Sequence, residues 1–201
     1  MADSANRTLT RKLSAVFLDR DGVLNEKMPG GSYVASWGDF HPLPGAAEAI
    51  GWLNRAGLRV VVVSNQRGIA LGLYTRADVE AIHSALQGVL KAHGAHVDGF
   101  YLCPHDVGEC NCRKPLAGLF EQAAADFPAI TAANSAMIGD SLSDMEFGRR
   151  LGMLTVLIDG GAEGERAGAR AAGELCDLRF PSLAEAVEAL LAEPPAGDRS
   201  D

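Results

Sequence analysis

Basic residues are in the minority in this sequence. Its 201 residues include 18 lysines and arginines against 26 aspartates and glutamates, which gives a formal net charge of −8. A nucleic-acid-binding protein usually presents a basic face to the phosphates, often with aromatic residues between the basic ones, and neither feature is visible here. The charge therefore argues against a nucleic-acid partner. It does not exclude a small phosphorylated ligand, which needs only a few local cations.

Long apolar runs are also missing. The first residues, MADSANRTLTRKL, contain cations, but no apolar run of signal-peptide length follows them, and AVFL (15–18) is too short to span a membrane. We therefore expect a cytoplasmic protein with no membrane segment. Hydrophobic residues make up 47% of the chain, enough to bury one core. We expect a single, monomeric domain at 13–191, with flexible ends at 1–12 and 192–201.

Cysteine is scarce and unevenly distributed. Three of the four cysteines lie with a histidine in the stretch CPHDVGECNCRKP, as Cys103, His105, Cys110 and Cys112. A disulfide framework would connect distant segments, so this spacing favours a metal site. Three thiolates and one imidazole suit Zn²⁺, and four protein ligands leave no open position for a substrate, which predicts a structural zinc site. The alternatives are a coincidental cluster of reduced cysteines, an iron–sulfur cluster or a redox dithiol.

Short apolar runs alternate with helical patterns along the chain. Five runs are typical of buried parallel strands, at 14–19, 59–65, 99–103, 135–140 and 154–159. Five segments have the apolar spacing or the end signals of helices, at 44–57, 75–93, 116–126, 143–151 and 182–191. This alternation predicts an α/β three-layer sandwich around a mostly parallel, Rossmann-like sheet. Ligands then bind at the carboxyl ends of the strands.

Reactive side chains follow four of the predicted strands. Two carboxylates end the first strand, a hydroxyl and two amides end the second, an Arg-Lys pair follows the third, and two further carboxylates follow the fourth. The residues are Asp19 and Asp21, Ser64-Asn65-Gln66, Arg113-Lys114, and Asp140 with Asp144. Each group alone could be a turn, a solvated pair or a helix start. Together they predict an oxygen-ligand site for Mg²⁺ beside an anion site.

Four stretches resemble the four motifs of the haloacid dehalogenase superfamily, and specifically its phosphatases without a large cap domain: FLDRDGVLN, VVVSNQRGI, CRKP and MIGDSLSDM. The resemblance covers about residues 15–160. The Cys-x-His and Cys-x-Cys-Arg-Lys-Pro arrangement is similar to one branch, which contains D,D-heptose 1,7-bisphosphate phosphatases and histidinol-phosphate phosphatases. The resemblance implies a core without a large cap domain, and a zinc-bound loop at 103–112.

The resemblance also implies a role for each site residue. Asp19 would be the nucleophile that forms an aspartyl-phosphate, and Asp21 would be the general acid and base. Mg²⁺ would be held by Asp19, the backbone carbonyl of Asp21, and Asp140. Ser64 would bind a phosphoryl oxygen, and Lys114 would stabilise the transition state. Asp144 would orient either a metal-bound water or the lysine.

The substrate implied is a small sugar phosphate, with heptose 1,7-bisphosphate converted to the heptose 1-phosphate as the first choice. The sequence of segment 65–75 resembles that of the heptose bisphosphate phosphatases, whereas the short length of loop 103–112 is closer to that of the histidinol-phosphate phosphatases. Segment 27–43, with Trp37 and His41, either covers the sugar or is an ordinary surface loop. The residues expected to contact the substrate are Asn65, Gln66, Arg67, Arg113 and Ser141.

A binding module remains as a hypothesis of another class. In that case the zinc loop would be an interaction knuckle and the aspartates a non-catalytic Mg²⁺ site.

Overall fold

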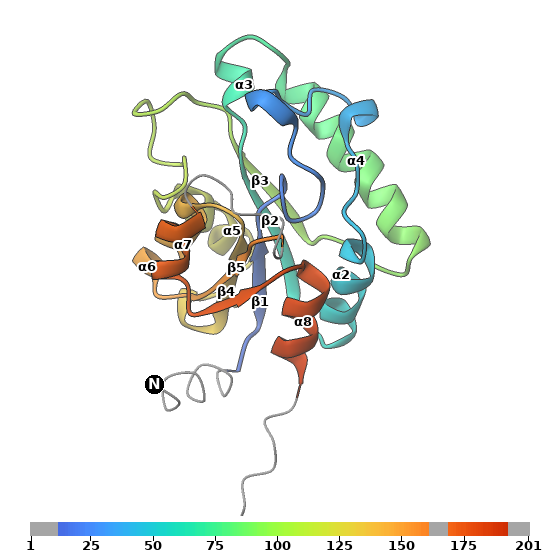
Figure 1. Cartoon of the computed structure of the whole chain (residues 1–201), viewed down its shortest axis with the longest axis vertical. Coiled ribbons are helices and arrows are strands. Elements are labelled where there is room, and N and C mark those ends of the chain that lie inside the picture. The colour runs from blue at the N-terminus through green and yellow to red at the C-terminus, as the bar shows by residue number, and fades with distance from the viewer. Residues whose placement is uncertain (1–11, 161–168, 193–201) are drawn as a thin grey trace, which may run out of the picture.

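A six-stranded parallel sheet forms the centre of the computed structural model, which describes residues 12–160 and 169–192 (Figure 1). Its strands are β1 (Ala15–Leu18), β2 (Arg59–Asn65), β3 (Gly99–Cys103), β4 (Ser135–Gly139), β5 (Leu154–Ile158) and β6 (Leu178–Phe180). They lie in the order β3-β2-β1-β4-β5-β6, and every neighbouring pair is parallel. The predicted α/β sandwich is confirmed.

Helices cover both faces of the sheet. Successive residues of a strand point to opposite faces, so Val16 and Leu18 of β1 join one apolar core while Ala15 and Phe17 join the other. The first face packs against α2 (Ala46–Arg55), α4 (Arg76–Ala92) and α8 (Leu183–Leu191). The second packs against α5 (Gly118–Asp126), α6 (Leu142–Leu151) and α7 (Ala169–Leu175). Burial on both faces explains why the strands are unbroken apolar runs in the sequence.

The structure contains elements that the sequence pattern did not predict. These are α3 (Arg67–Ala70), α7, β6, and short 3-10 helices at Pro29–Gly31, Trp37–Asp39 and Ala132–Asn134. Each is too short, or too poor in periodic apolar residues, to give a signal of its own. The helix predicted from residue 44 begins at Ala46, because Gly45 takes a left-handed φ of 76°.

No separate cap domain is present among residues 12–160 and 169–192, in agreement with the expected core. Within the same residues, no helix has the length and apolar character needed to cross a membrane. The predicted flexible ends lie outside the described residues, except for Lys12 and Ala192. Cys176, the fourth cysteine, is half-buried and packs against the core formed by Met145, Leu157 and Ala172.

The strand order places the ends of β1 and β4 next to each other. From β1 the chain moves to β2 on one side of the sheet, whereas β4 pairs with β1 on the other side. Ligands of open α/β sheets bind at such a reversal, outside the carboxyl ends of the strands. The residues directly beyond these two ends are Asp19 and Asp140.

Candidate active site

The strand ends surround a cavity of about 300 Å³. Its walls come from the residues after β1, the end of β2, the Arg-Lys pair after β3, the start of α6, and segment 27–34. Eight of the predicted site residues line it: Asp19, Asp21, Ser64, Asn65, Gln66, Arg113, Lys114 and Ser141. Asp140 and Asp144 are buried and are not among the lining residues. The fold therefore brings together side chains that are more than a hundred positions apart in the sequence.

Three carboxylates form a cluster at the ends of β1 and β4. One oxygen each from Asp19, Asp140 and Asp144 lies within 4.8 Å of the others. Burial and the charge of Asp144 together raise the pKa of Asp19 to about 7, although the charge of Lys114 opposes the shift. Carboxylate oxygens crowded in this way fit a hard divalent cation such as Mg²⁺, whose charge would offset their repulsion.

Lys114 is the cation buried closest to the nucleophile candidate. Its side chain is almost fully buried, and its Nζ lies 3.0 Å from Asp19 Oδ1 and 2.6 Å from Asp144 Oδ1. The Nζ also donates to the backbone oxygen of Val63 at 2.8 Å. Burial alone would lower the pKa of Lys114, but the two carboxylates together raise it, so the ammonium is kept. Asp144 thus contacts Lys114, as one of its two predicted roles requires.

Asn65 holds the backbone of Lys114. Its Oδ1 accepts from the Lys114 N–H at 3.0 Å, and its Nδ2 donates to the Lys114 carbonyl at 3.1 Å. Both halves of the amide are therefore engaged by protein. Asn65 lines the cavity, as predicted for a substrate contact, but its hydrogen bonds attach the segment after β3 to the end of β2.

Asp21 has a set of partners different from those of Asp19. Its carboxylate accepts from Arg20 at 3.0 and 3.1 Å, from Asn25 Nδ2 at 2.9 Å and from Gln66 Nε2 at 3.3 Å. The side chain of Arg20 is 1% exposed and that of Asp21 is 27% exposed, so the ion pair is shielded from solvent on the arginine side and open to the cavity on the other. The carboxylate of Asp21 is not part of the cluster of three. The metal contact predicted for Asp21 was through its backbone carbonyl, which remains a prediction.

Two basic residues differ from expectation. Arg67, predicted to contact the substrate, does not line the cavity, and its guanidinium pairs with Asp106 of the ligand loop at 2.6 Å. Lys27, which the sequence reasoning did not single out, lines the cavity, and its Nζ lies 2.7 Å from Asp140. Such a lysine carries no sequence signal, because it lies in an irregular loop 113 positions from its partner.

Segment 27–43 is divided between two environments. Its first part, through Val34, contributes six residues to the cavity lining: Lys27, Met28, Gly31, Ser32, Tyr33 and Val34. Trp37 and His41 are not among the lining residues, and the indole of Trp37 stacks on Phe40 with ring centroids 5.0 Å apart. The first part covers the cavity, whereas the second behaves as a surface loop.

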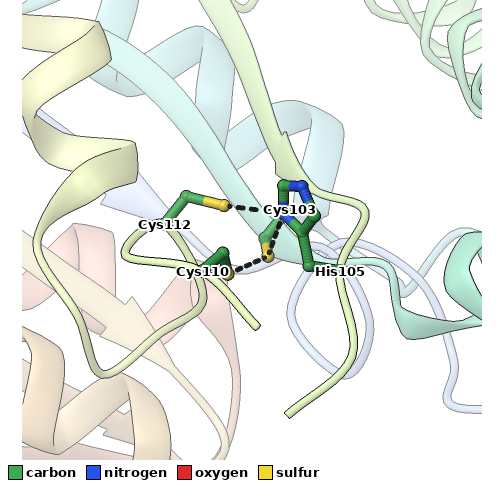
Figure 2. A group of neighbouring side chains, drawn as sticks. All are labelled: Cys103, His105, Cys110 and Cys112. Atoms are coloured by element: carbon green, nitrogen blue, oxygen red, sulfur yellow. Dashed lines mark hydrogen bonds between the residues drawn. The ribbon is translucent and has the colours of Figure 1, made fainter. Parts of the chain in front are cut away.

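The predicted zinc ligands converge at the end of β3 and in the loop that follows it. Figure 2 shows the side chains of Cys103, His105, Cys110 and Cys112 directed at one another, and their ligand atoms all lie within 4.8 Å. Cys103 Sγ is 3.5 Å from Cys110 Sγ, and His105 Nδ1 is 3.3 Å from Cys112 Sγ. Three sulfurs, one imidazole nitrogen and no oxygen suit a four-coordinate Zn²⁺.

The backbone after the cluster connects it to the cavity. The Arg113 N–H donates to Cys110 Sγ at 3.4 Å. Burial by itself would raise the pKa of the Cys110 thiol. This hydrogen bond and those from neighbouring groups outweigh burial and lower the pKa to about 7. A thiolate is the form that binds a metal, so the backbone favours the ligand state of Cys110 and fixes Arg113 beside it.

Comparison with known proteins agrees with this geometry. A family model described as HAD-hydrolase-like matches residues 111–186. A D-glycero-alpha-D-manno-heptose-1,7-bisphosphate 7-phosphatase from Mycobacterium tuberculosis is 39% identical over 171 residues, covering 85% of this chain and 87% of that protein. The chain belongs to the haloacid dehalogenase superfamily. A D-glycero-beta-D-manno-heptose-1,7-bisphosphate 7-phosphatase from Pseudomonas putida is 37% identical and covers 77% of this chain and 86% of that protein.

Solved structures of this superfamily show the same fold. The D,D-heptose 1,7-bisphosphate phosphatase of B. bronchiseptica, complexed with magnesium and phosphate, superimposes with a TM-score of 0.77 at 31% identity, covering 89% of this chain and 98% of that one. The enzyme from Burkholderia thailandensis gives a TM-score of 0.65 at 30% identity, covering 90% and 99%. The resemblance recognised in the four motifs is therefore confirmed.

Proposed function

We propose that the protein is a Mg²⁺-dependent phosphatase that removes the 7-phosphate of D-glycero-D-manno-heptose 1,7-bisphosphate through an aspartyl-phosphate on Asp19. The observation that carries the proposal is the gathering of Asp19, Asp21, Ser64, Lys114 and Arg113 around one cavity. Relatives with 39% and 37% identity bear the name of this activity, for the alpha and the beta anomer respectively.

The first half-reaction transfers the phosphoryl group to Asp19. A carboxylate oxygen of Asp19 attacks phosphorus while the bond from phosphorus to the sugar oxygen breaks. Asp19 must be ionised to attack, and Lys114 Nζ at 3.0 Å favours that form against the effect of burial. Mg²⁺, held by Asp19, Asp140 and the backbone carbonyl of Asp21, would screen the charge between the nucleophile and the phosphate. Ser64 would donate to a phosphoryl oxygen.

The second half-reaction returns the enzyme to its starting state. In the first step Asp21 gives a proton to the leaving sugar oxygen, so it becomes a carboxylate that can accept a proton from water. That water attacks phosphorus, and the bond from phosphorus to the Asp19 oxygen breaks to release phosphate. Asp21 suits this exchange because it lines the same cavity as Asp19 and is held by Arg20, Asn25 and Gln66.

The cations of the cavity favour a substrate with two anionic groups. Lys114 is engaged by Asp19 and Asp144, whereas Arg113 lines the cavity and its Nη1 is buried without a hydrogen-bond partner in the described part of the chain. A buried guanidinium nitrogen without a partner is costly, and a second phosphate would supply one. This supports a bisphosphate over histidinol phosphate, which has a single phosphate.

A substrate panel tests the proposal. Phosphate release would be measured with and without Mg²⁺ on both anomers of the heptose bisphosphate, on histidinol phosphate and on a generic aryl phosphate. We expect Mg²⁺-dependent release with a heptose bisphosphate as the best substrate. Preference for histidinol phosphate would overturn the substrate, and no release from any compound would favour the non-catalytic binding module.

The proposal includes a reducing compartment, the cytoplasm, because four free cysteines, three of them in a metal-ligand cluster, require one to stay reduced. The expected monomer stays a prediction that analytical ultracentrifugation would check.

A further inference from the structure

The amide of Gln66 joins two residues of the proposed reaction. Its Nε2 lies 2.6 Å from Ser64 Oγ and 3.3 Å from Asp21 Oδ2, so its two hydrogens can serve both. Gln66 is 2% exposed, and Ser64 is 1% exposed. Because Ser64 Oγ accepts from the amide, its own hydroxyl hydrogen remains able to donate to a phosphoryl oxygen. Gln66, expected to be a substrate contact, therefore also acts as a bridge within the protein.

The other half of the amide is held by Tyr74. The phenol O–H of Tyr74 donates to Gln66 Oε1 at 2.8 Å, in a contact between two buried side chains. Burial raises the pKa of Tyr74 to about 12, so the phenol keeps its proton at any working pH. Tyr74 is not among the residues that line the cavity, so its hydroxyl acts on Gln66 and has no direct route to a substrate there.

The direction of the amide depends on this hydroxyl. When Gln66 Oε1 accepts the hydrogen bond from the Tyr74 hydroxyl, Gln66 Nε2 must face Ser64 and Asp21. An amide rotated by half a turn would place Oε1 against the Asp21 carboxylate and Nε2 against the phenol. Removal of the hydroxyl would leave Oε1 buried without a donor, which penalises the present orientation.

The backbone of α3 fixes the Tyr74 ring. A Cβ on Gly68 would lie only 2.1 Å from Tyr74 Cε1, so the ring packs directly on a residue that has no side chain. The ring also packs with Val79 and Leu102 in a small apolar cluster, and its centroid lies 5.9 Å from that of Tyr33. The hydroxyl is therefore held in a position set by α3, α4 and β3.

We propose that Tyr74 is a positioning residue, whose hydroxyl orients the Gln66 amide so that Ser64 and Asp21 are held in the relation that phosphoryl transfer needs. This inference rests on the proposed function. It assigns the stretch LGLYT, which follows α3, a part in the reaction that the position of Tyr74 outside the cavity lining does not suggest.

The test is a double-mutant cycle of Tyr74→Phe and Gln66→Met. Phe keeps the packed ring, and Met keeps the length of the glutamine side chain. We expect Tyr74→Phe to lower kcat on the order of 10-fold with KM within about twofold, because one hydrogen bond to the bridge is lost and no cavity group changes. In the Gln66→Met background the same change should have no further effect, since its target is gone.

Tyr101→Phe is the matched control. Its hydroxyl donates to Asp126 at 2.8 Å, at a more exposed position outside the cavity, so the control also loses one tyrosine hydrogen bond and should keep the wild-type kcat. An unchanged kcat in Tyr74→Phe, or a full additional loss in the Gln66→Met background, would overturn the inference. So would a kcat loss that Tyr101→Phe shares.

A second readout does not depend on turnover. The side-chain amide signal of Gln66 in a ¹H–¹⁵N spectrum, assigned by its absence in Gln66→Met, should show slow hydrogen exchange in the wild type and fast exchange in Tyr74→Phe. Equal exchange would contradict the bridge even if the variants were inactive. A wild type inactive on every phosphate ester would instead contradict the proposed function and leave this readout to decide on Tyr74.

Discussion

Asp19 has the environment of a group that needs a cation to work. Its side chain, 13% exposed, lies beside those of Asp140 and Asp144, and the ammonium of Lys114 opposes their charge on Asp19 at 3.0 Å. The result is a pKa of about 7, where an ordinary aspartate has 3.8. In the proposed reaction, the reactivity of Asp19 and its need for a metal would both arise from this crowding of carboxylates at two strand ends.

The variant Asp19→Asn tests the role of this residue. The amide has nearly the same shape and no charge, so the fold should be kept, whereas an amide cannot form the acyl phosphate. We expect turnover to fall by at least about 10³-fold, with an unchanged circular dichroism spectrum. Asp39→Asn, in an exposed 3-10 helix, is the control and should retain activity. Turnover near the wild-type rate in Asp19→Asn would exclude the covalent route.

Lys27 allows a separate test of the metal site. Its ammonium pairs with both oxygens of Asp140 at 2.7 Å, so a divalent cation on Asp140 would meet a like charge. We expect Lys27→Met to bind Mn²⁺, used as a probe for Mg²⁺, several-fold more tightly in a calorimetric titration. Lys91→Met, at the exposed end of α4, should leave the affinity unchanged. Equal affinities in all three proteins would show that Lys27 does not compete with the metal.

At the scale of elements, the loop after β3 is attached to the rest of the molecule at several points. Arg67 holds Asp106 within the loop, and Asn65 holds the backbone of Lys114 just after it. The backbone of Arg113 is hydrogen-bonded instead to Cys110 of the cluster of three cysteines and one histidine. A metal bound to the cluster would therefore hold the loop most directly at Arg113, the proposed contact for a second phosphate.

Removal of zinc is the corresponding prediction. A chelator should lower kcat/KM by on the order of 10²-fold, because a displacement of about 1 Å in the groups that bind phosphate is enough for such a loss. We expect KM to rise more than kcat falls, since Asn65 still holds Lys114. Zn²⁺ should restore the activity, whereas Mg²⁺ should not. A zinc-free sample that keeps full activity with Mg²⁺ alone would contradict a supporting role for the cluster.

The elements also differ in how far the sequence could predict them. Strands β1 to β5 were predicted to within a residue at each end, because burial on both faces makes them continuous apolar runs. The strand β6 is only three residues long and contains Arg179, and α3 is a single turn with a glycine. Such elements are stabilised by contacts with neighbouring strands and helices. Their own residues are too few to show the apolar periodicity that predicts a strand or a helix.

At the scale of the whole molecule, His83 couples stability to pH. It is 6% exposed, stacks on Phe100 with centroids 4.3 Å apart, and has a pKa lowered to about 4 by burial and by the charge of Arg20. The unfolded chain, with an ordinary histidine pKa of 6.5, binds more protons than the folded chain between these two values. The stability is therefore complete above pH 6.5 and falls as the pH drops toward 4.

His83→Leu should reduce this acid sensitivity. Each pH unit in that window costs the wild type at most about 1.4 kcal/mol of unfolding free energy through this histidine. Urea unfolding at pH 7 and at pH 4.5 would measure the difference, which should shrink in His83→Leu. His96→Leu, at a histidine whose side chain is 59% exposed, is the control and should keep the wild-type difference. If the unfolding free energy of His83→Leu changed between pH 7 and pH 4.5 as much as that of the wild type, His83 would not be the source of the acid sensitivity.

The sequence by itself determined the fold class, the chemical groups of the site and the strand ends that carry them. It could do so because buried parallel strands leave continuous apolar runs, and because a reactive residue that directly follows such a run must lie at the ligand-binding edge of the sheet. The zinc ligands could also be predicted from the sequence, because they are close together in the sequence as well as in space.

Only the tertiary structure decided what each polar side chain contacts. It forms ion pairs between Lys27 and Asp140 and between Arg67 and Asp106. It also forms hydrogen bonds between Asn65 and the backbone of Lys114, and between the phenol of Tyr74 and Gln66. Three of these four pairs join segments that are 39 or more positions apart. The physical reason is that hydrogen bonds and ion pairs depend on distances of about 3 Å, which the packing of separate elements sets and no local pattern records.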